Sequence, residues 1–394
     1  MLAALGKSLH QVGLSAHRVE DALSRAAAQY GMPLQVFSFP TGLMLSVDAR
    51  PTPVTLLLRV PPGAVHLEQL SKLSAIAARI TRGSLGATDA HSQIEQVMQA
   101  PARWGRVATV LAYVLSAGAF AVFFGGAVPE VITGTVVGLA VGVLSVITQQ
   151  LHLSRMLFEL VAATVAAAIA NLATALYGPF SEWIPLASGL IILLPGLALV
   201  DAIEELAHGH LTSGSARLAG VGAVLLAMTF GALLGLVLID TTAIDQPEAT
   251  APTLGTWYMA AALVAVAIGS TIRFRGRAID VWVALAASAM ALVGSKLGAA
   301  WLGQFAGPFL AAFLLGATAN GYARFSGQPA QLFTVPGLAL LVPGSFGVRS
   351  MSALLSENTA VGVDTAFHMF LAAMALVTGL LIANSMFRQH DAGI

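Results

Sequence analysis

The pattern of hydrophobic and polar positions divides the chain into two parts that meet near residue 106. In the first part charged residues recur every few positions, so no stretch there is apolar for long enough to cross a bilayer. From Val107 onward, apolar stretches of about 20 residues follow one another, which is the length that a helix needs to cross about 30 Å of hydrocarbon. We therefore predict a polar N-terminal domain followed by membrane-spanning helices.

The second part predicts ten transmembrane helices. The fourth and the ninth are the least regular, because each contains a Pro-Gly pair in its middle. The ten spans are predicted near residues 107–125, 129–148, 156–176, 183–206, 217–239, 256–273, 278–297, 302–323, 331–355 and 364–386.

The first part predicts a small cytosolic α/β domain. Residues 15–30 place Val19 and Leu23 on one apolar helical face, and residues 66–82 return to helical spacing. Between these helices lie three runs rich in β-forming residues: QVFSF at 35–39, GLMLSV at 42–47 and VTLLLRV at 54–60. The predicted domain boundaries are 1–104 for this domain, and 105–240 and 255–388 for two halves of the membrane part.

These two halves resemble each other. The matching pairs, at an offset of 148 or 149 residues, are Leu193-Leu194-Pro195-Gly196 with Leu341-Val342-Pro343-Gly344, Gly231 with Gly379, and Asn171 with Asn320. The membrane part is therefore predicted to be five spans duplicated. Because five is odd, the second copy must be inverted in the membrane. Inverted repeats are a transporter architecture, in which substrate binds near the midplane at broken helices.

Composition agrees with a membrane protein. The chain has 394 residues, of which 57% are hydrophobic and 10% charged, whereas soluble proteins carry about 25% charged residues. A net charge of zero predicts no nucleic-acid partner. The apolar spans and the transporter architecture make the lipid bilayer and a small polar molecule the expected partners. We find no cysteine and no P-loop, HExxH or GxSxG motif, so ATP-driven pumping and hydrolysis have no support. No cofactor is expected, and the chain is not predicted to be an enzyme.

The positions of Lys and Arg predict the orientation, because these residues mark the cytoplasmic side. If residues 1–106 are inside, the outer side keeps only Lys296 and Arg349. The predicted inner ends and loops carry Arg103, Arg106, Arg155, Arg217, Arg273, Arg275, Arg277, Arg324 and Arg388. Both termini are therefore predicted to be cytoplasmic, and the N-terminus lacks the features of a signal peptide.

The two Pro-Gly pairs are the first candidates for a substrate site. A proline in the middle of a helix removes a backbone donor and clashes with the preceding turn. A half-helix that starts there would direct its positive dipole end at a substrate carboxylate, although a packing kink is the alternative. Asn171 and Asn320 suit either substrate contact or hydrogen bonds between helices. The candidate substrate-binding residues are Pro195, Gly196, Asn171, Asn320, Pro343, Gly344 and Ser345.

Charged residues inside a membrane are costly and usually functional. Asp201 and Glu204 share a helix face after the first break, where they either couple protons or simply reach cytosolic water. Glu159 follows Arg155 by four residues, which favours an ion pair at a helix end. Arg349 matches Asp201 in the repeat, but inversion places the two at opposite membrane faces. The candidates for proton coupling or gating are Asp201, Glu204, Glu159 and Arg349.

Two further patterns carry less information. His208-Gly209-His210 has the residue types of a metal-binding pair, but without a third ligand a water-exposed loop is the better interpretation, and we predict no metal site. Glycines at every fourth position, such as Gly134, Gly138 and Gly142, let helices approach closely. Such faces would also suit contact between two copies of the chain.

Residues 15–47, SAHRVEDALSRAAAQYGMPLQVFSFPTGLMLSV, resemble the opening of the threonine/serine exporter family. In that family a small-x-x-Arg-x-Glu helix, matched by Arg18 and Glu20, leads to a Pro-Thr-Gly turn. The resemblance extends over the whole chain and implies export of threonine and serine across the bacterial inner membrane, driven by the proton gradient. Two-chain relatives imply dicarboxylates such as succinate as the alternative substrates. Arg18 and Glu20 are either a fold-stabilising pair or a gating contact.

The N-terminal domain is predicted to be regulatory or to plug the cytosolic side. His17 and Glu20 share a helix face there without a nucleophile, so they do not form a catalytic site. A membrane-anchored sensor or enzyme is the remaining alternative. An anchor needs one or two spans, whereas this chain predicts ten with matching breaks.

Overall fold

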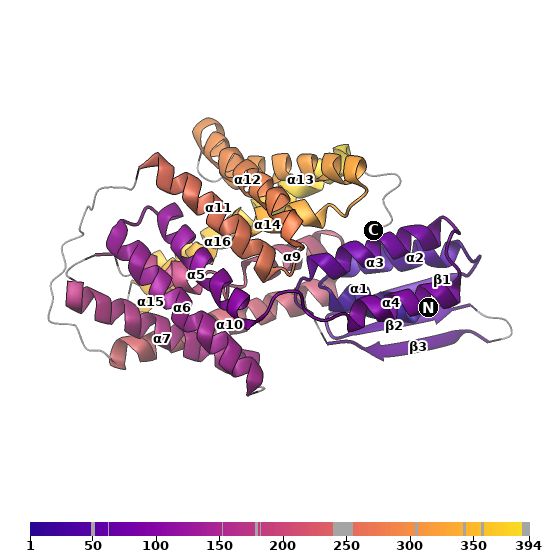
Figure 1. Cartoon of the computed structure of the whole chain (residues 1–394), viewed down its shortest axis with the longest axis horizontal. Coiled ribbons are helices and arrows are strands. Elements are labelled where there is room, and N and C mark those ends of the chain that lie inside the picture. The colour runs from indigo at the N-terminus through magenta and orange to yellow at the C-terminus, as the bar shows by residue number, and fades with distance from the viewer. Residues whose placement is uncertain are drawn as a thin grey trace.

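The computed structural model describes residues 1–48, 52–61, 63–151, 153–177, 180–181, 183–238, 255–303, 306–341, 344–355 and 358–387. Structural statements below concern these residues. Figure 1 shows a unit of strands and short helices, which holds the N-terminus, beside a larger bundle of helices.

We call residues 1–99 the N-terminal unit. Its elements are α1 (Leu2–Gln11), α2 (Ala16–Ala28), β1 (Leu34–Phe39), β2 (Gly42–Val47), β3 (Val54–Arg59), α3 (Leu67–Thr81) and α4 (Ala87–Gln99). The strands form one antiparallel sheet in the order β1-β2-β3, with Leu45 opposite Val36 and Leu56. The predicted helices over 15–30 and 66–82 and the three predicted strands are confirmed, whereas α1 and α4 were not predicted.

The hydrophobic core of the N-terminal unit continues into the helical bundle. Val19 and Leu23 on the predicted face of α2 have no exposed surface. Phe274, and Leu332 in α14 (Gln331–Leu341), belong to the same core. The Leu67 N–H also donates to the Phe274 carbonyl oxygen at 2.9 Å. The N-terminal unit is therefore held against the bundle by shared packing and by backbone hydrogen bonds.

The bundle contains long helices and shorter pieces of helix. In addition to α14, its helices are α5 (Arg106–Phe123), α6 (Val128–Gln150), α7 (Arg155–Tyr177), α8 (Trp183–Leu190), α9 (Gly196–Ala207), α10 (Leu211–Leu238), α11 (Thr256–Arg273), α12 (Val281–Leu302), α13 (Gly307–Ser326), α15 (Gly344–Leu355) and α16 (Thr359–Met386). Within the described ranges, seven stretches are long and apolar enough to cross a membrane: α5, α6, α7, α10, α11, α12 with its preceding turn, and α16. The chain is therefore a polytopic, mainly helical membrane protein.

The fourth predicted span is a broken helix. α8 ends at Leu190 and α9 begins at Gly196, with Pro195 in the N-cap position and outside helical geometry at ψ 36°. The described part of the ninth predicted span consists of α14 and α15, and the break predicted at Pro343 lies outside the described residues. Gly344 is packed so closely against Leu194 that an added Cβ would lie 3.0 Å from the Leu194 Cβ. The interruption of the fourth predicted span therefore contacts the start of α15.

The two halves of the bundle pack in the same way. α10 lies along α7, and α16 lies along α13. A side chain at Gly231 would collide with the Leu160 carbonyl oxygen, and one at Gly379 would collide with the Phe309 carbonyl oxygen. The two glycines matched by the predicted repeat thus each serve a close contact between helices.

Gly134, Gly138 and Gly142 also allow close packing between helices of the same chain. An added Cβ at these positions would meet Ser188, Ala117 or Tyr113 of neighbouring helices. A homo-oligomer built through glycine faces stays a prediction.

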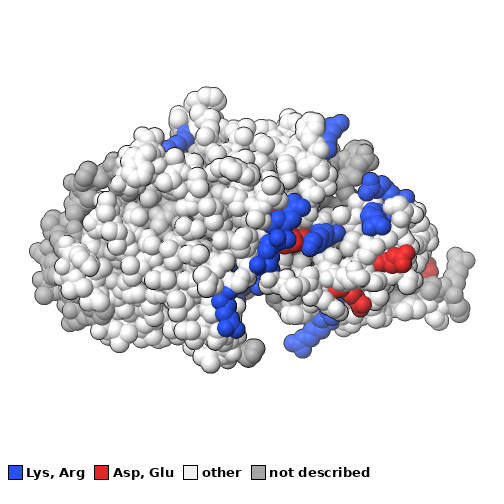
Figure 2. Space-filling view, viewed as in Figure 1, with Lys and Arg blue, Asp and Glu red and all other residues white. Residues whose placement is uncertain are grey.

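The surface of the bundle is largely uncharged. In Figure 2 the Lys and Arg side chains gather over the N-terminal unit and along its border with the bundle. Large apolar side chains are exposed on the helices, with Val237 78% and Trp301 76% exposed. Such an apolar surface would be costly in water and is typical of contact with lipid. This exposed apolar surface agrees with the prediction that the bundle contacts the lipid bilayer.

Candidate functional site

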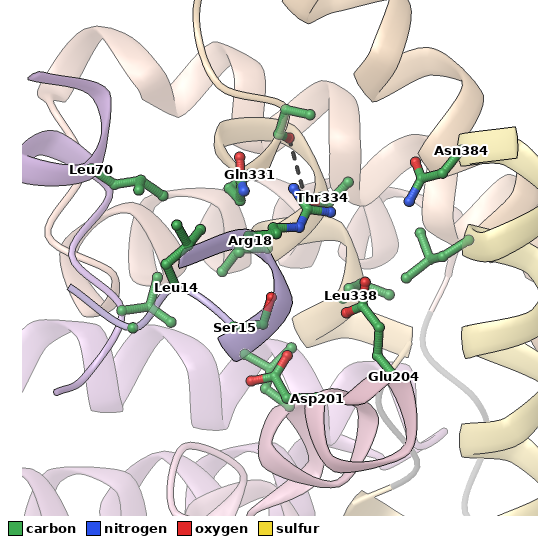
Figure 3. Close-up of a pocket in the computed structure, with 16 residues that line it drawn as sticks. Leu14, Ser15, Arg18, Leu70, Asp201, Glu204, Gln331, Thr334, Leu338 and Asn384 are labelled. Carbon is green, nitrogen blue, oxygen red and sulfur yellow. Dashed lines mark hydrogen bonds between the residues drawn. The ribbon is translucent and has the colours of Figure 1, made fainter. Parts of the chain in front are cut away.

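A cavity of about 80 Å³ lies where the N-terminal unit meets the bundle. One water molecule needs about 10–15 Å³ of cavity volume. A cavity of about 80 Å³ can therefore hold several waters or one small metabolite. It is lined by the turn before α2 together with Arg18, by the start of α3, and by faces of α9, α14 and α16 (Figure 3). These elements are far apart in the sequence, and only the fold brings them together.

The broken helix contributes the acidic side of the cavity. Because Pro195 interrupts the fourth span, α9 starts afresh at Gly196. Leu197, Asp201 and Glu204 then follow at spacings of four and three residues, which places them on one helical face. All three line the cavity, as the predicted shared face of Asp201 and Glu204 requires.

Two helices of the second half contribute neutral polar groups. Gln331 and Thr334 lie three residues apart in α14 and line the cavity, as does Asn384 of α16. Asn384 accepts a hydrogen bond from the Asn320 side chain at 3.0 Å. Asn320 was predicted as a substrate ligand. It does not line the cavity itself but contacts Asn384, which does.

The N-terminal unit contributes the basic side. Gly13 has a φ of +84°, which favours glycine, and an added Cβ would lie 3.0 Å from the Val65 backbone. This tight turn leads into α2 and presents Ser15 and Arg18 to the cavity. Figure 3 shows the Arg18 side chain extending toward α14, while Asp201 and Glu204 rise from α9. The cation and the two carboxylates thus enter from different elements.

Gln331 lines the cavity with an amide group that has no partner within the protein. Its side chain is 8% exposed, and neither its amide nitrogen nor its amide oxygen has a hydrogen-bond partner. Leaving a buried donor or acceptor unpaired costs about 1–3 kcal/mol, and buried polar groups are almost always paired. A ligand in the cavity would supply the missing donor and acceptor.

A buried ion pair holds the N-terminal unit beside the cavity. Glu205 has no exposed surface, and both of its oxygens contact the Arg217 guanidinium, at 2.9 and 3.2 Å. Glu205 also accepts hydrogen bonds from Ser213 at 2.8 Å and from the Ala16 N–H, at the start of α2, at 3.3 Å. This pairing explains why α10 begins at Leu211, earlier than the predicted 217, because its polar first turns have buried partners.

Two histidines lie together at the C-terminal end of α9, next to Glu204. The His17 and His208 rings are stacked with centroids 4.2 Å apart, and His17 Nε2 is 3.8 Å from Glu204 Oε1. Burial lowers the pKa of His17 to about 3, so its ring is neutral at neutral pH. Glu20 accepts a hydrogen bond from the Ser38 N–H at 2.8 Å and lies 3.7 Å from His210 Nδ1, so it contacts the sheet and the loop after α9.

Other predicted site residues lie outside the cavity. Asn171 is buried on α7, and Glu159, 2% exposed, forms the predicted ion pair with Arg155 at 2.8 Å. The Arg349 guanidinium lies 4.1 Å from the centre of the Trp183 ring, at the start of α8. Pro343 and the side chain of Ser345 are not among the described parts of the chain. The functional roles of these residues stay predictions.

Sequence reasoning missed three of the polar lining residues. Gln331, Thr334 and Asn384 were not predicted, and the role of Arg18 was left open. The available signal was the presence of polar side chains in the apolar ninth and tenth spans. Polar side chains in these spans indicate a polar helix face. They do not indicate that this face lies against Arg18 of the N-terminal unit.

Comparisons with known proteins agree with one family. Residues 1–239 match the family described as "Putative threonine/serine exporter", and residues 258–386 match "Threonine/Serine exporter, ThrE". No solved structure matches the chain.

Individual relatives are distant but extend over most of the chain. It is 23% identical to the threonine/serine exporter of Corynebacterium glutamicum, with 85% of this chain and 70% of that protein covered. It is 25% identical to the probable threonine/serine exporter of Mycobacterium tuberculosis, with 84% and 65% covered. It is 24% identical to pheromone-regulated membrane protein 10 of Candida albicans, with 90% and 33% covered, so the chain spans only a third of that relative. Because the first family match includes more than half of its residues, the chain belongs to the threonine/serine exporter family.

Proposed function

We propose that this chain is a secondary active exporter that carries threonine or serine out of the cytosol, driven by the proton gradient. The observation that carries the proposal is the cavity in which Arg18, two carboxylates and the unpaired Gln331 amide converge. The relatives named as threonine/serine exporters support the same substrate class.

The chemistry of the cavity matches a zwitterion with a hydroxyl group. The Arg18 guanidinium suits the substrate carboxylate, because such pairs form strong charge-assisted hydrogen bonds. Asp201 or Glu204 suits the ammonium group. The Gln331 amide can both donate to and accept from a side-chain hydroxyl. A site that hydrogen-bonds a hydroxyl discriminates strongly against analogues without one.

A dicarboxylate fits the same cavity less well. Succinate would bring two negative charges to a cavity lined by one cation and two carboxylates. Like charges at short range repel each other, and a cavity with little water screens them poorly. The charge balance therefore favours the amino acid over the dicarboxylate.

We place this cavity at the cytosolic mouth of a ten-span transporter built from two inverted five-helix repeats. The paired helix contacts and the matched close approaches at Gly231 and Gly379 support the duplication. Lys and Arg on the same side as the N-terminal unit support cytoplasmic termini in a bacterial inner membrane. The contact between Gly344 and Leu194 supports a deeper substrate position at the midplane, beside the interruption of the fourth span.

In this proposal the N-terminal unit forms the cytosolic gate. It supplies Arg18 and the turn at Gly13, so the cavity is complete only while the unit is docked. Undocking would open the cavity to the cytosol, and docking would close it around the substrate. Asp201 or Glu204 would carry the coupled proton on the cytosolic side.

Counterflow into proteoliposomes tests this function. Purified protein is reconstituted into vesicles preloaded with threonine, serine or succinate, and uptake of the labelled form of each is measured. We expect uptake with threonine and serine at rates well above protein-free vesicles, and little uptake with succinate. Transport of succinate alone would replace the proposed substrate class, and transport of none of the three would contradict the proposed function.

A further inference from the structure

We propose that His17, Glu204 and His208 form a binding site for a divalent transition-metal ion of the zinc class, and that the ion ties α2 to the end of α9. The three side chains come from parts of the chain nearly two hundred residues apart. This distance explains why His208 and His210 alone did not predict a metal site in the sequence.

The geometry brings one ligand atom from each residue into a small volume. These atoms all lie within 4.8 Å of one another. In a tetrahedral zinc site with bonds of about 2.0–2.1 Å, ligand atoms are about 3.3 Å apart. The site therefore needs a contraction of up to about 1.5 Å between ligand atoms, which side-chain rotation can supply because His208 is exposed. The same exposure gives an ion access from water.

His208 is already oriented as a ligand. Its Nδ1 lies 2.8 Å from the Glu204 carbonyl oxygen, to which it donates in the neutral tautomer. This hydrogen bond leaves the lone pair on Nε2. Metal-binding histidines are held in just this way, with the second ring N–H bonded to a carbonyl or carboxylate oxygen.

His17 has no complete hydrogen bond at either ring nitrogen. Its Nδ1 is buried without a partner. Its Nε2 is 3.8 Å from Glu204 Oε1, which is longer than a hydrogen bond. A buried ring nitrogen without a hydrogen-bond partner is costly. A metal ion would bind one of the ring nitrogens and draw in the Glu204 carboxylate.

The donor set selects the class of metal. Two imidazoles and one carboxylate are ligands that zinc and related ions accept, with a water in the fourth position. Calcium and magnesium prefer oxygen ligands alone. Because Glu204 also lines the cavity, a bound ion would connect α2 to α9 directly beside the proposed substrate position.

Zinc titration of the purified full-length chain tests the site. Protein freed of metal with a chelator is titrated with Zn²⁺ by calorimetry in excess Mg²⁺, for wild type, His208→Ala and Glu204→Gln. His91→Ala is the matched control, because His91 pairs with Glu95 at 3.4 Å on the exposed face of α4. We expect one Zn²⁺ per chain in wild type and control, and at least ten-fold weaker binding in the two site variants.

Thermal unfolding provides the second measurement. Zn²⁺ should raise the melting temperature of wild type and of His91→Ala, but not that of His208→Ala, because ligands stabilise the state that binds them. Equal zinc affinity in wild type and His208→Ala, or no saturable zinc binding, would overturn the proposal. Both measurements are independent of transport, so they do not depend on the proposed export function.

Discussion

At the scale of single residues, Arg18 is the cation through which the cavity can hold a carboxylate. We expect Arg18→Gln to raise the half-saturation concentration for threonine counterflow by roughly 10–100-fold, because a hydrogen bond to a charged group contributes about 1.5–3 kcal/mol. Arg25→Gln, on the exposed side of the same helix, is the matched control and should behave like wild type. Unchanged half-saturation in Arg18→Gln would remove Arg18 from the proposed site.

Asp201 and Glu204 are the residues at which proton coupling is expected. An amide cannot take up a proton, so Asp201→Asn should lose the dependence of uptake on a pH gradient. Substrate counterflow should persist, because exchange needs no net proton movement. Uptake with and without a pH gradient measures the difference. If Asp201→Asn and Glu204→Gln both keep the wild-type dependence, Glu159 becomes the next candidate, since its buried Oε2 has no hydrogen-bond partner.

Glu68 is expected to make stability depend on pH. Hydrogen bonds from Arg103, at 2.8 and 2.9 Å, and from Lys72 lower the pKa of Glu68 from 4.5 to about 2. A lowered folded-state pKa stabilises the protein above pH 4.5, and this stabilisation is lost as the pH falls toward 2. Glu68→Gln should therefore melt below wild type at pH 7, with a difference that shrinks between pH 4.5 and 2.

The exposed Glu95 provides the comparison for Glu68. Glu95→Gln should melt within a degree or so of wild type at each pH, because surface ion pairs contribute little. A Glu68→Gln difference that stays constant from pH 7 to 3 would show that its effect is not electrostatic.

At the scale of helices, the close contacts at Gly231 and Gly379 make a matched pair of tests. Gly231→Val and Gly379→Val should each destabilise the protein by about 1–3 kcal/mol or more, because the new side chain meets backbone that cannot move away. Gly222→Val faces open space and is the control. Melting temperatures in detergent measure all three. Tolerance at only one of the two glycines would argue against equivalent packing in the two halves.

The sequence predicted most of the helices and the interruption of the fourth span, because long apolar runs and a central proline are local signals. It did not predict α1, whose short sequence contains Gly6, or α4, which buries only Ala90 and Ile94 among its residues. It also did not show that Pro336, unlike Pro195, lies inside a continuous helix. The cavity itself could not be predicted, since Arg18 and Gln331 meet only through the packing of the N-terminal unit on the bundle.

At the scale of the whole molecule, the absence of cysteine allows a direct test of orientation. Ala251→Cys, in the segment between α10 and α11, and Ser24→Cys, on the exposed surface of α2, each introduce a single thiol. We expect a membrane-impermeant maleimide to label intact cells at position 251 only, and at both positions after lysis. Labelling of Ser24→Cys in intact cells would contradict cytoplasmic placement of the N-terminal unit.

The core that joins Leu23, Phe274 and Leu332 has a consequence for biosynthesis. Domains generally fold in the order in which the ribosome makes them. Here the first hundred residues are translated long before Phe274 and Leu332. The apolar surface that packs against these two residues therefore stays uncovered until they are made. The N-terminal unit can complete its core only after the later helices have entered the membrane. The contacts with Phe274 and Leu332 are therefore the last of this core to form, although most of its residues are made first.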